Sequence, residues 1–352
     1  MSASAANKHL DNKAILNGVI ASLLLTAAIY FGSGQLKRFD PALIAYTSAT
    51  IFATFGIVYR YSVWLQKPPT RLYWRRGWQL FLRPRDLPRN IIKLLGLLFK
   101  NIFLQVFIER RSHLRWAAHF LMSWGCIVAV MVTFPLVFGW VHFEADPKDP
   151  AAYQAMIMGI HAGTFPANSL VGWVTFHILD FCAVAVIVGM TLAFRRRMSD
   201  KGAMAVQSYT MDFLPLILLF SVSITGLMLT ASAMWMHGHS YSFIALIHAF
   251  SVIVTLLYLP FGKFFHIFQR PASLGVQYYK QEGAITAQAA CNRCGENYAS
   301  LMHVQDLKVV LGELGLDQSF EDGTHYQEIC PQCRRRLIAL NQLEAIGGDG
   351  FI

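Results

Sequence analysis

Six long apolar runs, separated by polar segments, dominate the pattern of the chain. They cover residues 14–34, 41–65, 116–140, 170–194, 212–236 and 241–267. Each is about as long as the 20-residue helix that crosses the hydrocarbon core of a bilayer. The first run follows two lysines, as a signal peptide would, but lacks a convincing small-residue cleavage site, so we expect it to remain as a helix. The pattern predicts an all-α membrane protein, a six-span transmembrane helix bundle.

A further apolar segment, residues 91–107, carries Lys93, Lys100 and Gln105. We interpret it as an amphipathic helix lying in the membrane interface on the cytoplasmic side. As a seventh span it would put the two halves of one basic loop on opposite sides of the membrane. The chain thus divides into two N-terminal spans (1–65), a basic loop with the interfacial helix (66–115), a four-helix core (116–270) and a polar tail (271–352).

Composition and charge agree with this topology. Hydrophobic residues make up 55% of the chain and charged residues 14%, against roughly 25% charged in a soluble domain, which excludes a set of soluble domains. The net charge is +10, and 27 of the 30 lysines and arginines lie on one side of the predicted spans. This asymmetry places both termini in the cytoplasm and the protein in the inner cell membrane. The basic excess therefore reports topology, and nucleic acid is not an expected partner.

Four histidines lie inside the predicted spans: His119, His177, His248 and His266. His248 and His266 are 18 residues apart, which is five turns of a continuous helix. Their rings would then project from one face about 27 Å apart, less any kink at Pro260. That spacing suits two haem groups near opposite leaflets. A single intramembrane histidine can equally serve as a hydrogen-bond partner for a neighbouring helix.

Depth in the membrane pairs the four histidines. His119 lies four residues inside the cytoplasmic end of the third span, and His266 lies four residues before Arg270. His177 and His248 each lie seven residues into their spans from the outer ends. We therefore predict two six-coordinate b-type haems. The inner haem takes His119 and His266 as axial ligands, and the outer haem takes His177 and His248.

Basic residues at the cytoplasmic border, Arg115 and Lys263 together with Arg60, are candidate partners for haem propionates. As ordinary positive-inside residues they need no haem. Small residues in the spans either let a flat macrocycle approach a helix or let the spans pack closely. These residues are Gly125, Gly189, Gly226 and Gly262.

Residues 246–271, LIHAFSVIVTLLYLPFGKFFHIFQRP, resemble the last helix of the gamma subunit of respiratory nitrate reductase. That family includes the membrane cytochromes b of heterodisulfide- and sulfite-reductase-type complexes. The specific part is the two histidines 18 residues apart, the Pro-Phe between them and the basic residue before the second. DFLPLILLFSVSITGLML is similar to the preceding family helix, and RWAAHFLMSWG to the helix that bears the inner-haem ligand. The resemblance covers residues 110–280, about half of the chain.

The resemblance implies a quinone-reactive cytochrome b that exchanges electrons with a peripheral iron–sulfur, molybdenum, heterodisulfide-type or hydrogenase-type module. The sequence departs from the family at Ala129, where nitrate reductase gamma subunits carry a second histidine ten residues after the first. The outer haem is then either missing or takes its ligand from elsewhere, which the depth argument assigns to His177. The extra N-terminal span and a cysteine-containing tail also lie outside the family pattern, so the catalytic partner stays open.

Two residues near the outer haem are candidates for a quinone or proton site. His161 lies in the loop between the third and fourth spans. Asp180 follows His177 by three residues, so both lie on the same helical face. A carboxylate inside a span is costly, and this one either relays protons or orients the ligand histidine.

The tail contains two paired cysteines, Cys291-Asn-Arg-Cys294 and Cys330-Pro-Gln-Cys333. Each CxxC turn aims two sulfurs at one metal, and a reducing cytosol disfavours disulfides. The absence of CxxCH excludes covalent haem. We predict a metal site that holds structural zinc or, alternatively, an iron–sulfur centre.

Together these features predict a di-haem b subunit of a respiratory oxidoreductase complex. It would transfer electrons between quinone near the outer face and a cytoplasmic partner that contains iron–sulfur centres. A six-span transporter is an alternative, but it would gather polar residues at mid-depth and interrupt its helices, whereas these histidines lie near the two edges. A haem-free membrane anchor or scaffold with a zinc-stabilised tail is a second alternative.

Overall fold

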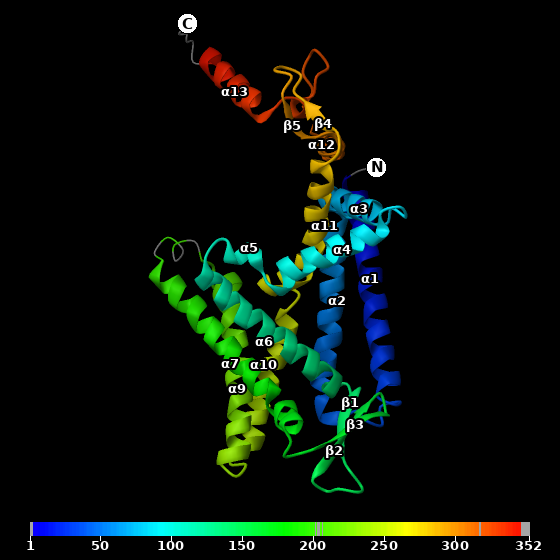
Figure 1. Ribbon diagram of the computed structural model, residues 1–352, viewed down its shortest axis with the longest axis vertical. Helices are drawn as coiled ribbons and strands as arrows, with labels where there is room; N and C mark the ends of the chain where they lie inside the picture. Colours follow the sequence, from blue (N-terminus) through cyan, green and yellow to red (C-terminus); the bar gives the residue numbers. More distant parts are fainter. Residues whose placement is uncertain (1–2, 201, 203–204, 206, 317, 346–352) are drawn as a thin grey trace. The chain divides into compact units, whose positions relative to one another are not determined.

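The protein is described here from a computed structural model, which covers residues 3–200, 202, 205, 207–316 and 318–345 (Figure 1). Within these residues, six helices are long and apolar enough to cross a membrane. They are Asp11–Gly32, Pro41–Gln66, His113–Val137, Leu170–Ser199, Tyr209–Trp235 and Tyr241–Tyr258. The predicted class, a helical membrane protein with six spans, is therefore confirmed, and the first apolar run is a helix.

The chain folds into two compact units, and each is made from two separate stretches of sequence. The first comprises Met1–Val63 and Lys100–Gln269, and the second comprises Trp64–Phe99 and Arg270–Ile352. The basic loop, expected as one segment over residues 66–115, thus divides between Phe99 and Lys100. Its first half joins the tail, and its second half joins the helices that carry the four histidines.

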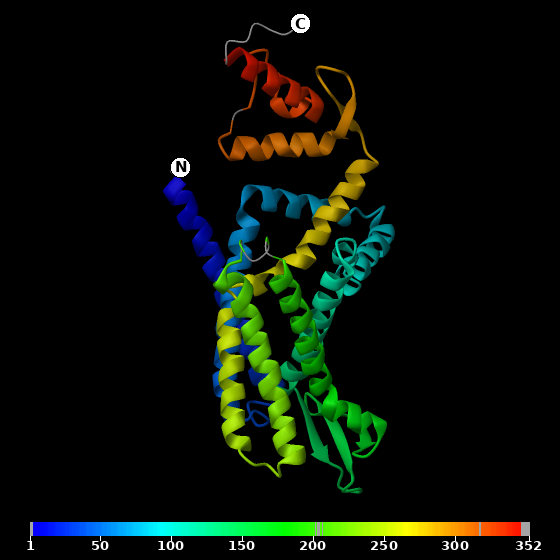
Figure 2. The same cartoon turned by 90° about the vertical axis from the view of Figure 1, so that its left-hand side faces the viewer.

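The spans of the first unit are the helices α1 (Ala3–Gly32), α2 (Ile44–Gln66), α6 (His113–Val137), α7 (Leu170–Ser199), α9 (Leu214–Trp235) and α10 (Tyr241–Tyr258). Shorter turns precede some of them: η1 (Pro41–Leu43), η2 (Phe99–Phe103), α5 (Val106–Glu109) and η3 (Tyr209–Phe213). The helices α6 and α7 pack on each other, as α9 does on α10 (Figure 2). Residues 91–107, expected as one interfacial helix, form the end of α4 (Leu87–Leu98) followed by η2 and α5.

Glycines let α6 and α7 approach closely. A Cβ atom added at Gly125 would lie 2.7 Å from Cγ2 of Val186, and one added at Gly189 would lie 2.7 Å from the carbonyl oxygen of Ala118. Contacts this short leave no room for any side chain. Two of the four glycines considered above therefore serve helix packing, which is the role that small residues commonly have between membrane helices.

The sixth predicted span is not one continuous helix. The helix α10 ends at Tyr258, and the 3-10 turn η4 (Lys263–Phe265) leads into α11 (His266–Ala284). Proline has no N–H to donate and its ring clashes with the carbonyl four residues earlier, so the chain turns at Pro260. His248 and His266 therefore do not share one helical face across five turns, contrary to the prediction, because His248 lies on α10 and His266 begins α11, beyond the end of the span.

An arginine from α2 stabilises this break. Nη1 of Arg60 donates to the carbonyl oxygens of Pro260 at 2.6 Å and Phe261 at 3.0 Å. Its guanidinium also lies over the Phe265 ring, 4.3 Å from the centroid. Carbonyl groups freed by a broken helix need a donor inside a membrane protein, and Arg60 provides one.

A small antiparallel sheet, which the apolar-run pattern did not predict, connects α6 to α7. It consists of β1 (Val141–Ala145), β2 (Ala152–Ile157) and β3 (Ile160–Pro166), in that order. One aromatic side chain from each strand contacts Phe176 at the start of α7, with centroid distances of 5.7 Å for Phe143, 5.2 Å for Tyr153 and 6.2 Å for Phe165. This aromatic cluster attaches the sheet to the helix.

The second unit combines the helix pair α3 (Pro68–Phe81) and α4 with the tail. Besides α11, the tail contains β4 (Gln288–Ala290), β5 (Asn297–Ser300), α12 (Leu301–Glu313), η5 (Tyr326–Glu328) and α13 (Pro331–Ala345). Asp306, 3% exposed, accepts from Nη2 of Arg76 and from the Tyr279 hydroxyl, both at 2.8 Å. Glu282, 5% exposed, pairs with Nζ of Lys93 at 2.6 Å. Buried charges therefore join the loop after the second span to the cysteine-containing tail.

Candidate metal and cofactor sites

The predicted inner pair of histidines is close together in the first unit. The ring centroids of His119 on α6 and His266 at the start of α11 are 6.3 Å apart, and their planes make an angle of 66°. A metal–imidazole bond is about 2 Å long, so two rings on opposite sides of one metal ion have centres roughly 6 Å apart. The spacing of this pair would allow both rings to bind one metal ion.

Hydrogen bonds fix the protonation of both rings. Nδ1 of His119 lies 2.8 Å from Oε1 of Gln105, and the amide nitrogen of the same Gln105 donates to Oγ of Ser123 at 2.6 Å. Nδ1 of His266 lies 2.5 Å from the carbonyl oxygen of Lys263, which can only accept. Both Nδ1 atoms therefore carry the proton, and the lone pair of each ring is on Nε2. This is the tautomer in which histidine binds a metal through Nε2, with its other nitrogen held by an oxygen.

The predicted outer pair shows the same tautomer but no mutual contact. Nδ1 of His177 donates to the carbonyl oxygen of Trp173 at 2.9 Å. Nδ1 of His248 lies 2.9 Å from Oγ1 of Thr225, whose own proton goes to the carbonyl of Ser221, so the histidine donates. Within the described residues no hydrogen bond or ring contact joins His177 to His248. The structure thus brings together the first pair and not the second.

The two candidate propionate partners have different surroundings. Nζ of Lys263 forms an ion pair with Oδ1 of Asp212 at 2.6 Å. Arg115, in the first turn of α6, is exposed, and it makes no ion pair in the part of the chain that the structure describes. Arg115 therefore has a side chain available for an anionic group, whereas Lys263 already has a carboxylate partner.

The candidate quinone residues have different hydrogen-bond partners. His161 is an exposed residue of β3, and its Nε2 lies 3.0 Å from Oγ1 of Thr164. Asp180 accepts a hydrogen bond of 2.7 Å from Oγ1 of Thr230, which links α7 to α9. Within the described residues, no hydrogen bond or ion pair joins either residue to the other or to His177. The carboxylate that looked out of place in the sequence thus has a definite partner on a neighbouring helix.

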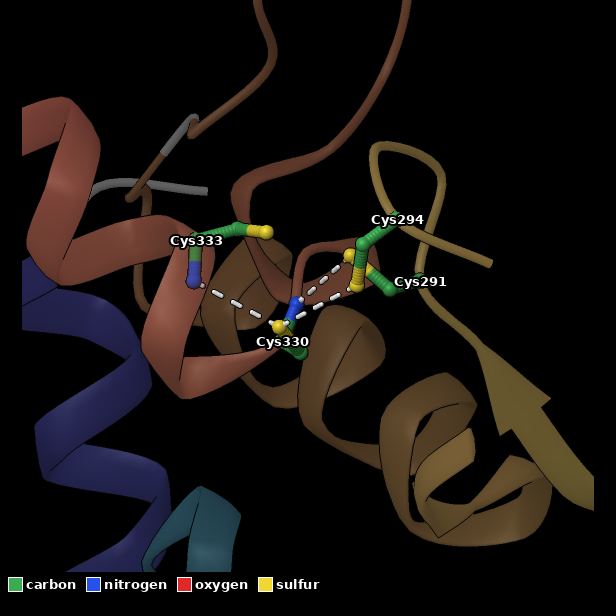
Figure 3. Close-up of side chains that lie close together, drawn as sticks. All are labelled: Cys291, Cys294, Cys330 and Cys333. Carbon is green, nitrogen blue, oxygen red and sulfur yellow. Dashed lines mark hydrogen bonds between the residues drawn. The ribbon is translucent and has the colours of Figure 1, made fainter. Parts of the chain in front are cut away.

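The four tail cysteines converge on one point (Figure 3). Their sulfurs all lie within 4.8 Å of one another, and the Sγ atoms of Cys294 and Cys330 are 3.7 Å apart. The first CxxC turn, Cys291–Cys294, is followed by Gly295, whose φ of 75° is in the left-handed region that favours glycine. The second begins α13, where the backbone N–H of Cys333 points at Sγ of Cys330, 3.4 Å away. The structure thus forms the predicted four-cysteine cluster.

Hydrogen bonds give the cysteines unequal acidity. Burial raises the pKa of Cys291, but backbone N–H donors, that of Cys330 foremost, outweigh it and lower the value to about 6. A hydrogen bond to the sulfur of Cys330 is the main cause that raises the pKa of Cys333 to about 12. These hydrogen bonds favour the thiolate form of Cys291, and a bound cation would favour the thiolate form of all its cysteine ligands.

The sulfur spacing bears on the kind of metal centre that the four cysteines could hold. In a tetrahedral site with zinc–sulfur bonds of about 2.3 Å, neighbouring sulfurs are about 3.8 Å apart, close to the 3.7 Å found here. In a cluster of two or four irons, cysteines bound to different irons are farther apart because sulfides bridge the irons, whereas all four sulfurs here lie within 4.8 Å of one another. The donor set therefore fits a single tetrahedral metal ion such as zinc.

Two residues that the sequence analysis did not assign to a site hold the histidines. Gln105, 4% exposed, has a φ of 55°, an uncommon backbone conformation for a residue other than glycine. Its sequence signal was a polar residue in an apolar segment, which we interpreted as part of an amphipathic pattern. Thr225 has no signal of its own, because threonines inside spans usually bond to their own helix.

Comparisons with protein-family models, with curated proteins and with solved structures found no match for this chain. The interpretation of its sites therefore depends on their own chemistry.

Proposed function

We propose that this protein is the b-type cytochrome subunit of a membrane oxidoreductase complex. The observation that carries the proposal is the His119–His266 pair, with ring centroids 6.3 Å apart and both Nδ1 protons directed to oxygen acceptors. These two side chains would hold one haem, and Arg115 would lie at the same end of α6 to meet a propionate. A haem with two histidine ligands supplies one-electron transfer without a change of ligands.

We also propose a second haem, held by His177 and His248, because of the chemistry of these two side chains. Both rings have the Nδ1-protonated form, and both lie on helices that pack against α9. Binding would need the two rings to take positions on opposite sides of one iron. Two haems near the two ends of the spans would let electrons cross the membrane.

The remaining parts follow from the charge asymmetry. With the basic segments in the cytoplasm of an inner-membrane protein, the His177 and His248 end faces outward and the His119 and His266 end faces inward. Quinone would react near the outward end, where Asp180 and His161 are candidate groups to hold a proton. The redox partner, an iron–sulfur or catalytic subunit of nitrate reductase, heterodisulfide reductase or hydrogenase type, would bind on the cytoplasmic side. Zinc would occupy the four-cysteine cluster in the tail.

The test is haem content and ligand dependence of the purified full-length protein. We expect a b-type α-band in the reduced-minus-oxidised spectrum and two haems per chain by pyridine haemochrome. His119→Ala should remove one haem and His177→Ala the other, whereas His113→Ala, a histidine whose side chain is 87% exposed, should remove neither. Protein that contains no haem after expression with added haem precursor would overturn the proposal.

A transporter remains the second candidate, because the helix break at Pro260 is the kind of interruption that transporter sites use. In those sites the freed carbonyl oxygens face a substrate or an ion. Here Arg60 occupies the carbonyls of Pro260 and Phe261, which argues for a structural break. Haem content decides between the two functions.

A further inference from the structure

Helix α4 packs with its polar side inward. Lys93 pairs with the buried Glu282, and Arg89 lies 3.8 Å from the same carboxylate. Asn90, 1% exposed, donates to the carbonyl oxygens of Leu80 and Phe81 at 3.1 and 3.0 Å. A helix on the surface of a water-soluble domain has the opposite arrangement, with its charges outside and its apolar side chains inside.

The outward side of α4 is apolar. Ile92 is 71% exposed, Leu95 59% and Phe99, just past the helix end, 51%. These exposures are large for such residues, and all three positions lie within eight residues of sequence. Exposed apolar surface of this kind marks an interaction site.

Helix α3 repeats the arrangement. Arg76 and Leu80 point into the second unit, where Arg76 meets Asp306 and Leu80 is 5% exposed. Trp74 and Trp78, 37% and 46% exposed, contact each other at a centroid distance of 5.7 Å. Tryptophan is the aromatic residue typical of the membrane interface, because its ring is apolar and its N–H can stay in contact with water.

Chain connectivity and charge identify what covers these side chains. The helix α3 begins at Pro68, two residues after α2 ends at Gln66, and α2 is long and apolar enough to cross a membrane. Only Lys67 separates the two helices, so α3 starts where the span ends. Residues 67–99 contain eight lysines and arginines and one acidic residue, Asp86. A positive segment next to a span is attracted to anionic lipid headgroups.

We infer that α3 and α4 form an interfacial platform, residues 68–99, that lies in a leaflet rich in anionic phospholipid. Its outward side chains, Trp74, Trp78, Ile92, Leu95 and Phe99, contact the acyl chains. The exposed Arg83 and Arg85, in the turn between the helices, contact phosphate groups. The Arg76–Asp306 and Lys93–Glu282 pairs join the same platform to the four-cysteine tail. The lipid composition of the leaflet therefore determines how strongly this part of the protein binds the membrane. The inference does not depend on haem.

Photolabelling of the full-length protein tests the platform. The protein is placed in nanodiscs of phosphatidylcholine and phosphatidylglycerol with a trace of phospholipid that carries a photoreactive diazirine on its acyl chain. Labelled residues are then mapped by mass spectrometry. We expect label on Ile92, Leu95 and Trp78 at least about fivefold above that on Ile338, Leu340 and Leu343. Those three residues of α13 are 47%, 44% and 44% exposed and serve as the matched control.

A charge-matched pair of variants tests the lipid class. We expect Arg83→Gln with Arg85→Gln to reduce the label on α4 about as much as replacing all phosphatidylglycerol with phosphatidylcholine does. Arg335→Gln with Arg336→Gln removes the same charge from α13 and should leave the label unchanged. Label on the spans is the internal reference for correct folding. Equal labelling of α4 and α13 would overturn the platform. Labelling of α4 that stays the same without phosphatidylglycerol and without the two arginines would overturn its preference for anionic lipid.

Discussion

Gln105 offers the sharpest test of how the protein would tune a haem on His119. Its Oε1 accepts from Nδ1 of His119 at 2.8 Å, its amide donates to Ser123, and the side chain is almost entirely buried. We predict that Gln105→Leu raises the midpoint potential of the haem held by His119 and His266, because the ligand ring loses an acceptor that makes it more electron-rich.

The magnitude follows from the strength of one buried hydrogen bond. A net contribution of about 1 kcal/mol corresponds to about 40 mV for a one-electron couple. Gln105→Glu replaces the amide by a charged acceptor, which bonds roughly twice as strongly, so the potential should shift by a similar amount in the opposite direction. Leucine and glutamate both carry a Cβ atom, so the backbone strain at a φ of 55° is the same in both variants.

The assay is an optical redox titration of the full-length protein in nanodiscs, in which the two proposed haems should give two waves. Thr225→Val serves as the control, because Thr225 contacts His248 and should shift only the other wave. Opposite shifts of one wave by the leucine and glutamate variants are the expected result. If both variants lower thermal stability but leave both waves unmoved, Gln105 only holds the backbone and the reasoning is refuted.

Three further predictions concern other parts of the molecule. Arg60→Ala removes the donor to the carbonyls of Pro260 and Phe261. It should lower the free energy of unfolding by about 1–3 kcal/mol and reduce the haem content measured by pyridine haemochrome. Arg110→Ala, which changes an exposed arginine, should do neither. Purified protein should contain one zinc per chain by plasma mass spectrometry, and Cys294→Ser should remove most of it. Iron bound to the cysteine cluster in place of zinc would contradict this prediction. Burial, followed by the hydrogen bond to Asp306, raises the pKa of Tyr279 above its ordinary value of 10.0. The stability that this tyrosine provides is therefore complete below pH 10.0 and is lost as the pH rises toward its folded-state value. Tyr279→Phe should flatten the fall in melting temperature at alkaline pH, and an unchanged alkaline slope would assign the effect to another group.

The sequence by itself determined the parts of this protein that depend on local physics. Six spans follow from apolar runs, because a membrane helix must be long enough to cross the hydrocarbon core and must satisfy its own backbone hydrogen bonds. Each CxxC turn brings its own two sulfurs together without help from the rest of the chain, whereas the meeting of the two turns depends on the fold of the tail. The adjacency of His119 and His266 was predicted from equal depth in two spans, although His266 lies beyond the end of α10, at the start of α11.

Other features came from contacts that no local pattern carries. Pro260 was visible in the sequence, yet whether a proline kinks a membrane helix or breaks it depends on what satisfies the freed carbonyls. Here Arg60 does so from 200 residues away in sequence. The assignment of His248 and His266 to one helical face failed for this reason.

The tertiary structure also decided how the polar segments are joined. Arg76 and Asp306, 230 residues apart, form a pair in which the carboxylate is almost fully buried. Nothing in the sequence around either residue distinguishes it from an ordinary surface charge. The inverted amphipathicity of α4 has the same origin: the sequence shows an apolar and a polar side, and only the buried Glu282 shows that the polar side faces inward. Local patterns thus specified which segments are helical and which enter the membrane, whereas long-range pairing of charges and carbonyls specified which side of each segment is buried.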